Sequence, residues 1–322
     1  MNPKLYIPSE KVNILKEFGF QIFDMNTAKI YEPYLKKMNG PTGSYMRVAN
    51  IICWGFYSVP YYLILDDFFI IINDDCYYKC FSAYAPVGDY ENGAGLNNVI
   101  SFINTVFIRL NQNLKLYMVK EWMRPYFDQL SGCDVEYTYD PAESDYLYDL
   151  GQLAESIKRR ALHYEHKIEH FELEYKPEIT EYSPSDYESC MHIIEEMYCD
   201  SEGCEACVFG CFKEFYKLVF SCIKDIDGTI IMFKSAGKTI AFVVFVEGED
   251  LLYFDRKATH NLLGFSEYLN QYIVKNYGSR FQIMNFEEDM GKEGLRRHKR
   301  ALGPYMLSHN YCMEIKKQNG KK

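Results

Sequence analysis

The same order of expected secondary structure occurs twice along this chain: three strands, a helix, a strand, a helix and a strand. Alternating or continuous apolar runs predict the strands, and apolar residues at helical spacing predict the helices. This repetition predicts an α+β fold of two tandem domains, each a mixed, mostly antiparallel sheet flanked by helices. The first copy is expected to comprise strands at 60–65, 68–73, 77–84, 114–119 and 134–140, with helices at 96–111 and 121–130. The second is expected to comprise strands at 229–233, 239–246, 251–255, 281–286 and about 305–315, with helices from Phe265 to Gly278 and after Asp289.

Charged helices are expected between the two copies, over 146–175 and from 184 to 199. Prolines interrupt the periodicity at 165–178, where we place the domain boundary. The expected domains are therefore residues 1–170 and 171–322. A chain of 322 residues is long enough for two such cores.

Composition limits the partners of the chain. Acidic residues outnumber basic ones by 45 to 35, so no overall positive field attracts nucleic acid or anionic lipid, and DNA binding is not expected. The N-terminal residues lack a secretory signal pattern. The longest apolar run, 51–65, is too short to span a bilayer. We expect a cytoplasmic protein without an integral membrane segment, and the sequence does not predict its oligomeric state.

The 11 cysteines are expected to be free thiols, because their number is odd and no export signal is present. Cys199, Cys204, Cys207 and Cys211 are spaced closely enough to suggest a zinc or iron–sulfur site. The last three also fall on one face of an expected helix, where cysteine packs as a small apolar residue. No second ligand pair completes a tetrahedral motif, so no metal is expected.

A phosphate-binding turn is the first candidate site. Three antiparallel strands followed by a glycine-bearing turn and a helix form a layout that holds a pyrophosphate at the helix N-terminus. The usual Gln/Arg-x-x-Gly-x-Gly/Ala consensus is represented here by Asn261, Gly264 and Ser266. One of its two glycines is present, so the motif does not support coenzyme A and no cofactor is expected.

The second candidate is the segment 285–304, in which three carboxylates precede two glycines and a group of basic residues. On an extended strand exit, Glu287 and Asp289 are expected on one side and Glu288 on the other. Asp289 is expected to cap the next helix. The basic residues are expected in the later turns of this helix, where the helix dipole favours cations. Because three adjacent carboxylates repel one another, at least one is expected to have a raised pKa or a basic partner.

The two glycines of this segment resist a purely structural explanation. Gly291 and Gly294 each cost about 1 kcal/mol in a helical turn relative to alanine. They are therefore expected where another backbone or a ligand comes close.

The third candidate is the basic triplet Lys158, Arg159 and Arg160. Such a triplet is typical of a solvated helical face or of a phosphate anchor.

The sequences at 254–258, at 262–271 and above all at 285–304 resemble the DUF2156 family, the C-terminal domain of phosphatidylglycerol lysyltransferases. Members show an Asn-x-x-Glu-Asp-x-Gly-x-x-Gly-Leu-Arg-x-x-Lys pattern. Its matches in this chain are Asn285, Glu288, Asp289, Gly291, Gly294, Leu295, Arg296 and Lys299. The chain departs from the family in its central helix, where Tyr164, Glu165 and His166 replace a Lys-Arg-Asn trio.

The resemblance implies a pair of domains like acyl-CoA N-acyltransferases (GNAT), as in peptidyltransferases that use aminoacyl-tRNA instead of coenzyme A. We expect an acyltransferase that moves an aminoacyl group from tRNA, or alternatively an acyl group from a small donor such as coenzyme A, to an amine or hydroxyl. Glu288 or Asp289 is expected to be the general base. Arg296 and Lys299 are expected to stabilise an oxyanion or hold a donor phosphate, with Asn285, Gly291 and Gly294 lining the substrate site.

Arg159 and Arg160 are expected to contact the backbone of the donor. The alternative is an inactive module that binds a phosphorylated or aminoacylated ligand or a protein partner.

Overall fold

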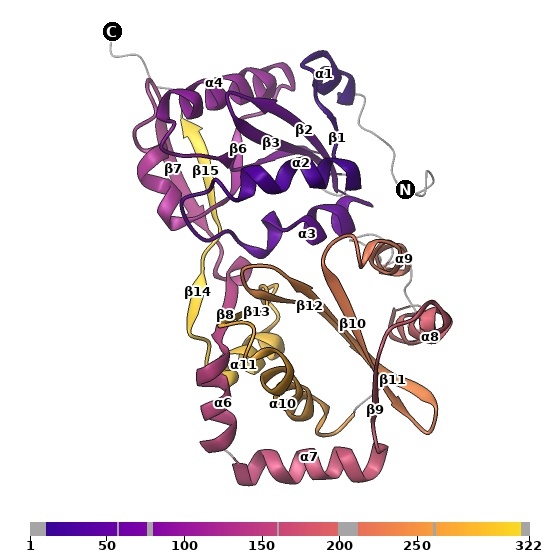
Figure 1. The fold of residues 1–322 in the computed structure, drawn as a ribbon. Coiled ribbons are helices and arrows are strands. Elements are labelled where there is room, and N and C mark those ends of the chain that lie inside the picture. Colours follow the sequence, from indigo (N-terminus) through magenta and orange to yellow (C-terminus); the bar gives the residue numbers. More distant parts are fainter. Residues whose placement is uncertain are drawn as a thin grey trace. The chain divides into compact units, whose positions relative to one another are not determined.

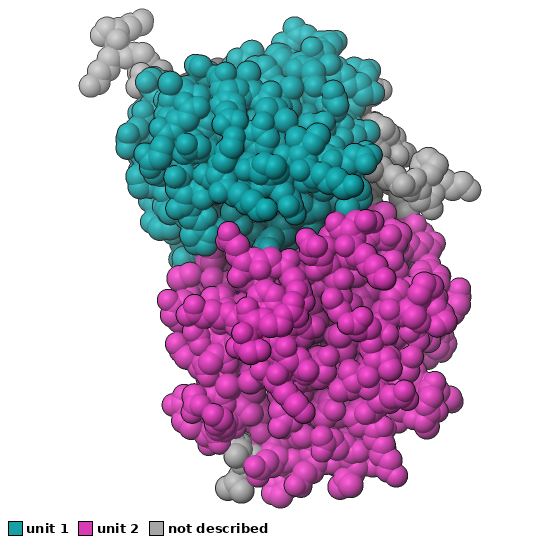
Figure 2. Space-filling model, in the orientation of Figure 1, with its two compact units in different colours: residues 1–143, 309–322 teal, residues 144–308 magenta. Residues whose placement is uncertain are grey.

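The computed structural model describes residues 11–56, 58–75, 80–159, 161–198, 212–259 and 262–316. These residues form two compact units, which are coloured separately in Figure 2. Unit 1 comprises residues 1–143 and 309–322, and unit 2 comprises residues 144–308. The boundaries of these units differ from the domain boundary at residue 170 that was expected from the sequence. The chain leaves the first unit after Glu143, before the central helices, and returns to it at His309.

Unit 1 contains an eight-stranded mixed sheet with the order β1-β2-β3-β4-β6-β15-β7, and β5 pairs with β3. β3 is buried almost throughout, which is typical of a strand that is covered on both faces. The strands are β1 (Gln21–Ile22), β2 (Ser58–Leu65), β3 (Phe68–Asp75), β4 (Cys80–Tyr84), β5 (Val87–Gly88), β6 (Lys115–Val119), β7 (Asp134–Tyr139) and β15 (Tyr311–Lys316). The helices are α1 (Val12–Glu17), α2 (Met25–Leu35), α3 (Val48–Cys53), α4 (Gly93–Arg109) and α5 (Arg124–Phe127), with short 3-10 turns at 44–46, 54–56, 121–123 and 141–143.

Unit 2 contains a seven-stranded mixed sheet with the order β14-β8-β13-β12-β11-β10-β9. Its strands are β8 (Asp145–Asp149), β9 (Glu178–Glu181), β10 (Gly228–Ser235), β11 (Lys238–Glu247), β12 (Leu251–Ala258), β13 (Ile283–Asn285) and β14 (Met306–Ser308). Its helices are α6 (Leu150–Arg159), α7 (Ala161–Tyr175), α8 (Tyr187–Tyr198), α9 (Phe212–Cys222), α10 (Phe265–Tyr277) and α11 (Glu293–Leu302), with a 3-10 turn at 184–186. The core beneath α10 joins aromatic and branched side chains of the sheet to the apolar face of this helix.

The two sheets repeat one pattern. In each, three consecutive antiparallel strands are followed by a helix and a strand that pairs in parallel with the third: β4 with β6, and β12 with β13. The first hairpins also match, because Asp66 and Asp67 have positive φ angles between β2 and β3, as do Ala236 and Gly237 between β10 and β11. The duplication expected from the order of elements is thus present in the topology.

The last strand of each copy lies in the sheet of the other copy. β15, yellow in Figure 1, pairs with β6 and β7 of the first sheet. β8 follows β7 along the chain but pairs with β13 and β14 of the second sheet. The sequence prediction was therefore wrong at residues 146–149, which form part of an internal strand rather than the start of a helix. Local periodicity could not reveal this pairing, since the partners of β8 are more than a hundred residues away.

Three further expectations concern the chain as a whole. In the described part, no helix has the length and hydropathy needed to cross a bilayer. Cys53, Cys80, Cys133, Cys190, Cys222 and Cys312 are free thiols, as expected. No group of His, Cys, Asp or Glu side chains among the described residues is placed to hold a metal ion, and the cluster at 199–211 lies outside those residues.

Candidate active site

β12 and β13 separate soon after they pair. Only Leu251 and Leu252 of β12 pair with β13, opposite Met284 and Asn285. β13 ends at Asn285, whereas β12 continues to Ala258. Residues 253–258 therefore present one strand edge that no residue of β13 covers. Where a strand edge has no strand partner, its backbone donors and acceptors can pair with another extended chain. Within this segment the Arg256 N–H already donates to Asp255 Oδ1 at 2.6 Å.

The loop that leaves β13, residues 286–292, begins with a sharp change of backbone direction. The Asn285 side chain accepts a hydrogen bond from the Glu287 N–H at 2.8 Å. Glu287 and Met290 have φ angles of 55° and 52°, and Gly291 has 70°. Left-handed backbone at non-glycine residues is strained and is maintained only by surrounding contacts. The expected strand alternation of the three carboxylates was wrong, because the strand ends at Asn285.

Asp289 is the most constrained carboxylate of this loop, with none of its surface exposed to solvent. Arg296 donates to it through Nε at 2.8 Å and Nη2 at 3.0 Å, which is a bidentate ion pair. The Tyr146 hydroxyl donates at 2.7 Å and the Gly291 N–H at 2.9 Å. All four donors hold the carboxylate in one orientation and tie the loop to both β8 and α11.

These contacts determine the protonation of Asp289. Burial alone would raise its pKa, but hydrogen bonds from Arg296, Tyr146 and the Gly291 N–H outweigh burial and lower the pKa to about 2. The expected basic partner of the acidic run is therefore Arg296. A carboxylate with so low a pKa is a weak base at neutral pH, so its geometry suits a positioning role.

Lys299 holds the same loop through its backbone. Its ammonium donates to the carbonyl oxygens of Phe286, of Glu287 at 3.2 Å and of Glu288 at 2.6 Å. The residue is only 5% exposed, and burial lowers its pKa, against the opposing charges of Glu288 and then Glu287. Since these carbonyls occupy the three ammonium protons, Lys299 is not placed to stabilise a substrate oxyanion.

β8 supports this arrangement from the far side. The Tyr148 hydroxyl donates to the Lys299 carbonyl at 2.6 Å, and Asn285 Nδ2 donates to Asp145 at 3.3 Å. The sequence prediction missed Asp145, Tyr146 and Tyr148 as parts of the site. Their signal was the alternation in DYLYD, which is typical of a strand with two tyrosines on one face.

Glu288 is partly exposed, in contrast to Asp289. Glu287 is also partly exposed, and Lys299 binds the backbone carbonyls of both glutamates. The sequence motif gave no means of separating Glu288 from Asp289. The structure distinguishes them by burial and by the four donors around Asp289.

Helix α11 begins later than expected. It starts at Glu293, and its N-cap residue is Lys292, so the predicted cap by Asp289 was wrong. Among described atoms, nothing lies within 4 Å of a Cβ built on Gly294, so no other backbone requires glycine at this position. Gly291 is needed for its left-handed backbone. A ligand beside Gly294 stays a prediction.

The N-terminus of α10 does not fit a pyrophosphate. A Cβ on Gly264 would lie 2.0 Å from the Lys167 carbonyl oxygen, so the backbone of α7 already occupies the space beside this glycine. Glu267 adds a negative charge to the first turn, paired with Lys167 at 2.6 Å. The Ser266 hydroxyl accepts from Arg256 at 2.8 Å. Gly264 thus serves close helix packing, and we assign no step to coenzyme A.

The remaining candidates are not joined to the Asp289 network. Arg159 is exposed at the end of α6, and its described hydrogen bond runs to the Glu155 carbonyl of its own helix at 3.4 Å. Arg160 and Asn261 lie outside the described residues. Donor contacts of these residues stay predictions.

Residues 38–314 match the sequence profile of a family described as phosphatidylglycerol lysyltransferase, C-terminal. The chain belongs to this family. The resemblance inferred from the signature at 285–299 is thereby confirmed. No curated protein sequence matches the chain significantly.

Solved structures show the same fold at low sequence identity. A conserved protein of unknown function from Bacteroides thetaiotaomicron is 19% identical, with a TM-score of 0.80 over 92% of this chain and 99% of that chain. L-PGS from Bacillus licheniformis is 14% identical, with a TM-score of 0.60 over 90% and 91% of the two chains. FemX is 10% identical, with a TM-score of 0.63 over 91% and 96%. The expected fold of two tandem GNAT-like domains is confirmed, and the chain shares its fold with L-PGS and FemX.

Proposed function

We propose that the chain transfers an aminoacyl group from aminoacyl-tRNA to an amine or hydroxyl acceptor. Its family and the fold that it shares with L-PGS and FemX support this class of reaction. The observation that carries the proposal is the edge of β12 at residues 253–258, which β13 leaves unpaired and which begins where the anchored loop leaves β13.

The strand edge provides a means of holding the donor. Its backbone N–H and C=O groups can pair with the amine and carbonyl of the aminoacyl group, as in strand addition. Tyr253 stacks on Phe286 with ring centroids 4.3 Å apart, so an aromatic wall joins this edge to the loop. The acyl carbon would then lie beside the loop that carries Glu288.

We assign Glu288 as the general base. It accepts a proton from the acceptor amine or hydroxyl while the nucleophile bonds to the acyl carbon. The ester bond to the terminal ribose oxygen of tRNA then breaks, and the proton passes to that leaving oxygen. Asp289 and Lys299 position the loop, so that Glu288 is presented with little loss of conformational entropy.

Arg296 is a cation of this site that is partly open to solvent. Its side chain is 32% exposed while its Nε and Nη2 atoms are bound to Asp289. A guanidinium fixed on one edge can contact a phosphate with the other. Arg159 and Arg160 are proposed as further contacts to the tRNA backbone. No part of this reaction requires coenzyme A.

The test uses tRNA charged with a radiolabelled amino acid, for each standard amino acid in turn. Filter binding compares charged with uncharged tRNA, and label transfer is followed to glycine amide and to phosphatidylglycerol vesicles. We expect one charged tRNA to bind at least about fivefold more tightly than its uncharged form, because only the former fills the acyl site. We also expect its label to pass to one acceptor. Binding without transfer for every tRNA would contradict the proposal and support a binding module.

A further inference from the structure

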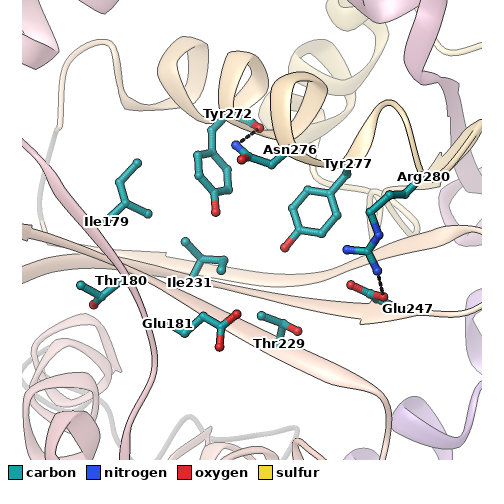
Figure 3. A pocket seen from close by; sticks show the side chains of 10 residues that line it. All are labelled: Ile179, Thr180, Glu181, Thr229, Ile231, Glu247, Tyr272, Asn276, Tyr277 and Arg280. Atoms are coloured by element: carbon teal, nitrogen blue, oxygen red, sulfur yellow. Dashed lines mark hydrogen bonds and ion pairs between the residues drawn. The ribbon is translucent and has the colours of Figure 1, made fainter.

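A cavity of about 310 Å³ lies between the C-terminal half of α10 and strands β9, β10 and β11 (Figure 3). It shares no lining residue with the Asp289 network or with the β12 edge. Ile179 and Ile231 form an apolar floor, and two tyrosines of α10 close the opposite side. The cavity has room for a small organic molecule.

Strand alternation explains why these side chains meet. Glu181 pairs with Ile231 across β9 and β10, and Ile179 lies two residues before Glu181 on the same face. From the helix above, Tyr272 and Tyr277 project toward this face of the sheet (Figure 3). The polar and apolar sides of the cavity are thus formed by residues of two strands and a helix rather than by a loop.

The tyrosines bring unused donors to the cavity. Tyr277 is only 5% exposed, and in the described part of the chain no hydrogen bond is formed by its hydroxyl or by that of Tyr272. Figure 3 shows both hydroxyls pointing into the space between helix and sheet. Both hydroxyls can therefore donate a hydrogen bond to an acceptor on a molecule that enters the cavity.

The net charge of the residues that line the cavity favours a positively charged ligand. Arg280 forms an ion pair with Glu247, and these two charges balance. No ion pair of Glu181 is found among the described residues, so one negative charge remains at the mouth. Burial and then Glu181 raise the pKa of Tyr272, which places this carboxylate within electrostatic reach of the hydroxyl.

We propose that this cavity binds a small organic ammonium ion that carries an oxygen acceptor. The ammonium group binds Glu181, the oxygen accepts from Tyr277, and the carbon chain lies on Ile179 and Ile231. The site is separate from aminoacyl transfer and does not depend on the proposed function.

The probe is 4-amino-1-butanol, measured by titration calorimetry on the full chain. Its neutral analogue, 1,4-butanediol, is expected to bind about fivefold more weakly, which matches the loss of an exposed ion pair. Glu181→Gln should weaken the amine by a similar factor, whereas Glu178→Gln on the same strand should not. Tyr277→Phe should weaken it about threefold or more, since one hydrogen bond is lost, and Tyr268→Phe on the same helix should leave it unchanged.

Two results would overturn the inference. One is absence of binding at about 50 mM probe, where even a weak fragment site is occupied. The other is equal binding of 4-amino-1-butanol to the parent chain, Glu181→Gln and Tyr277→Phe, which places the probe elsewhere. Glu181 is exposed on an edge strand, so its replacement leaves the fold intact.

Discussion

Replacing Glu288 by glutamine is expected to slow aminoacyl transfer by about 10²- to 10⁴-fold, the usual contribution of a general base. The amide keeps the size of the side chain but cannot accept the proton of the acceptor. The Glu288 carbonyl still binds Lys299, so the loop keeps its conformation. The affinity for charged tRNA should therefore change by less than about twofold, because the donor binds the β12 edge and not this carboxylate.

Glu293→Gln is the matched control. Glu293 is exposed in the first turn of the same α11 helix, and its ion pair with Arg297 at 3.8 Å lies on the surface. Its replacement should leave transfer within about twofold of the parent chain. A Glu288→Gln variant that retains a third or more of the parental rate would remove Glu288 from the mechanism.

Replacing Asp289 by asparagine is expected to lower the free energy of unfolding by about 3 kcal/mol at pH 7. The change leaves Arg296 without its bidentate partner and places an amide N–H₂ against donors that now face a carboxylate. Urea unfolding measures the difference. Asp225→Asn, on an exposed position of the same unit, should change stability by less than about 0.5 kcal/mol.

The effect of Asp289 should also depend on pH in a defined direction. Its folded pKa of about 2 lies below the ordinary value of 3.8, so its stabilising contribution is complete above the ordinary value and declines as pH falls toward 2. The stability difference between the parent chain and Asp289→Asn should shrink below about pH 4. A difference that is independent of pH would mean that the ion pair with Arg296 does not form.

Much of unit 2 followed from local sequence. The strands at 229–233, 239–246 and 251–255 and the helix from Phe265 were predicted because their periodicity and turn residues agree. The exchange of β8 and β15 between the sheets was not predictable in this way, because the local sequence of a strand does not show which distant strand will pair with it. The same long-range pairing brings Tyr146 to Asp289, a contact that spans 143 residues.

At the candidate site, too, the local sequence motif predicts some features, and contacts with distant segments determine the others. The acidic and basic residues of the signature at 285–299 do interact, through the ion pair of Asp289 with Arg296. The signature could not distinguish Asp289 from Glu288, because the two carboxylates differ in burial and in the hydrogen bonds that Asp289 accepts from β8 and α11. Nor could it reveal that Lys299 binds backbone carbonyl groups of the loop, because these contacts depend on the folded conformation of residues 286–288.

The most direct test of the proposed site is a crystal structure with an analogue of the 3′ end of aminoacyl-tRNA in which an amide replaces the ester. We expect the aminoacyl carbonyl to pair with the strand edge at 253–258, and the acyl carbon to lie beside Glu288 with room for one acceptor atom about 3 Å from its carboxylate. An analogue bound elsewhere, with the β12 edge and Glu288 left in solvent, would contradict this assignment.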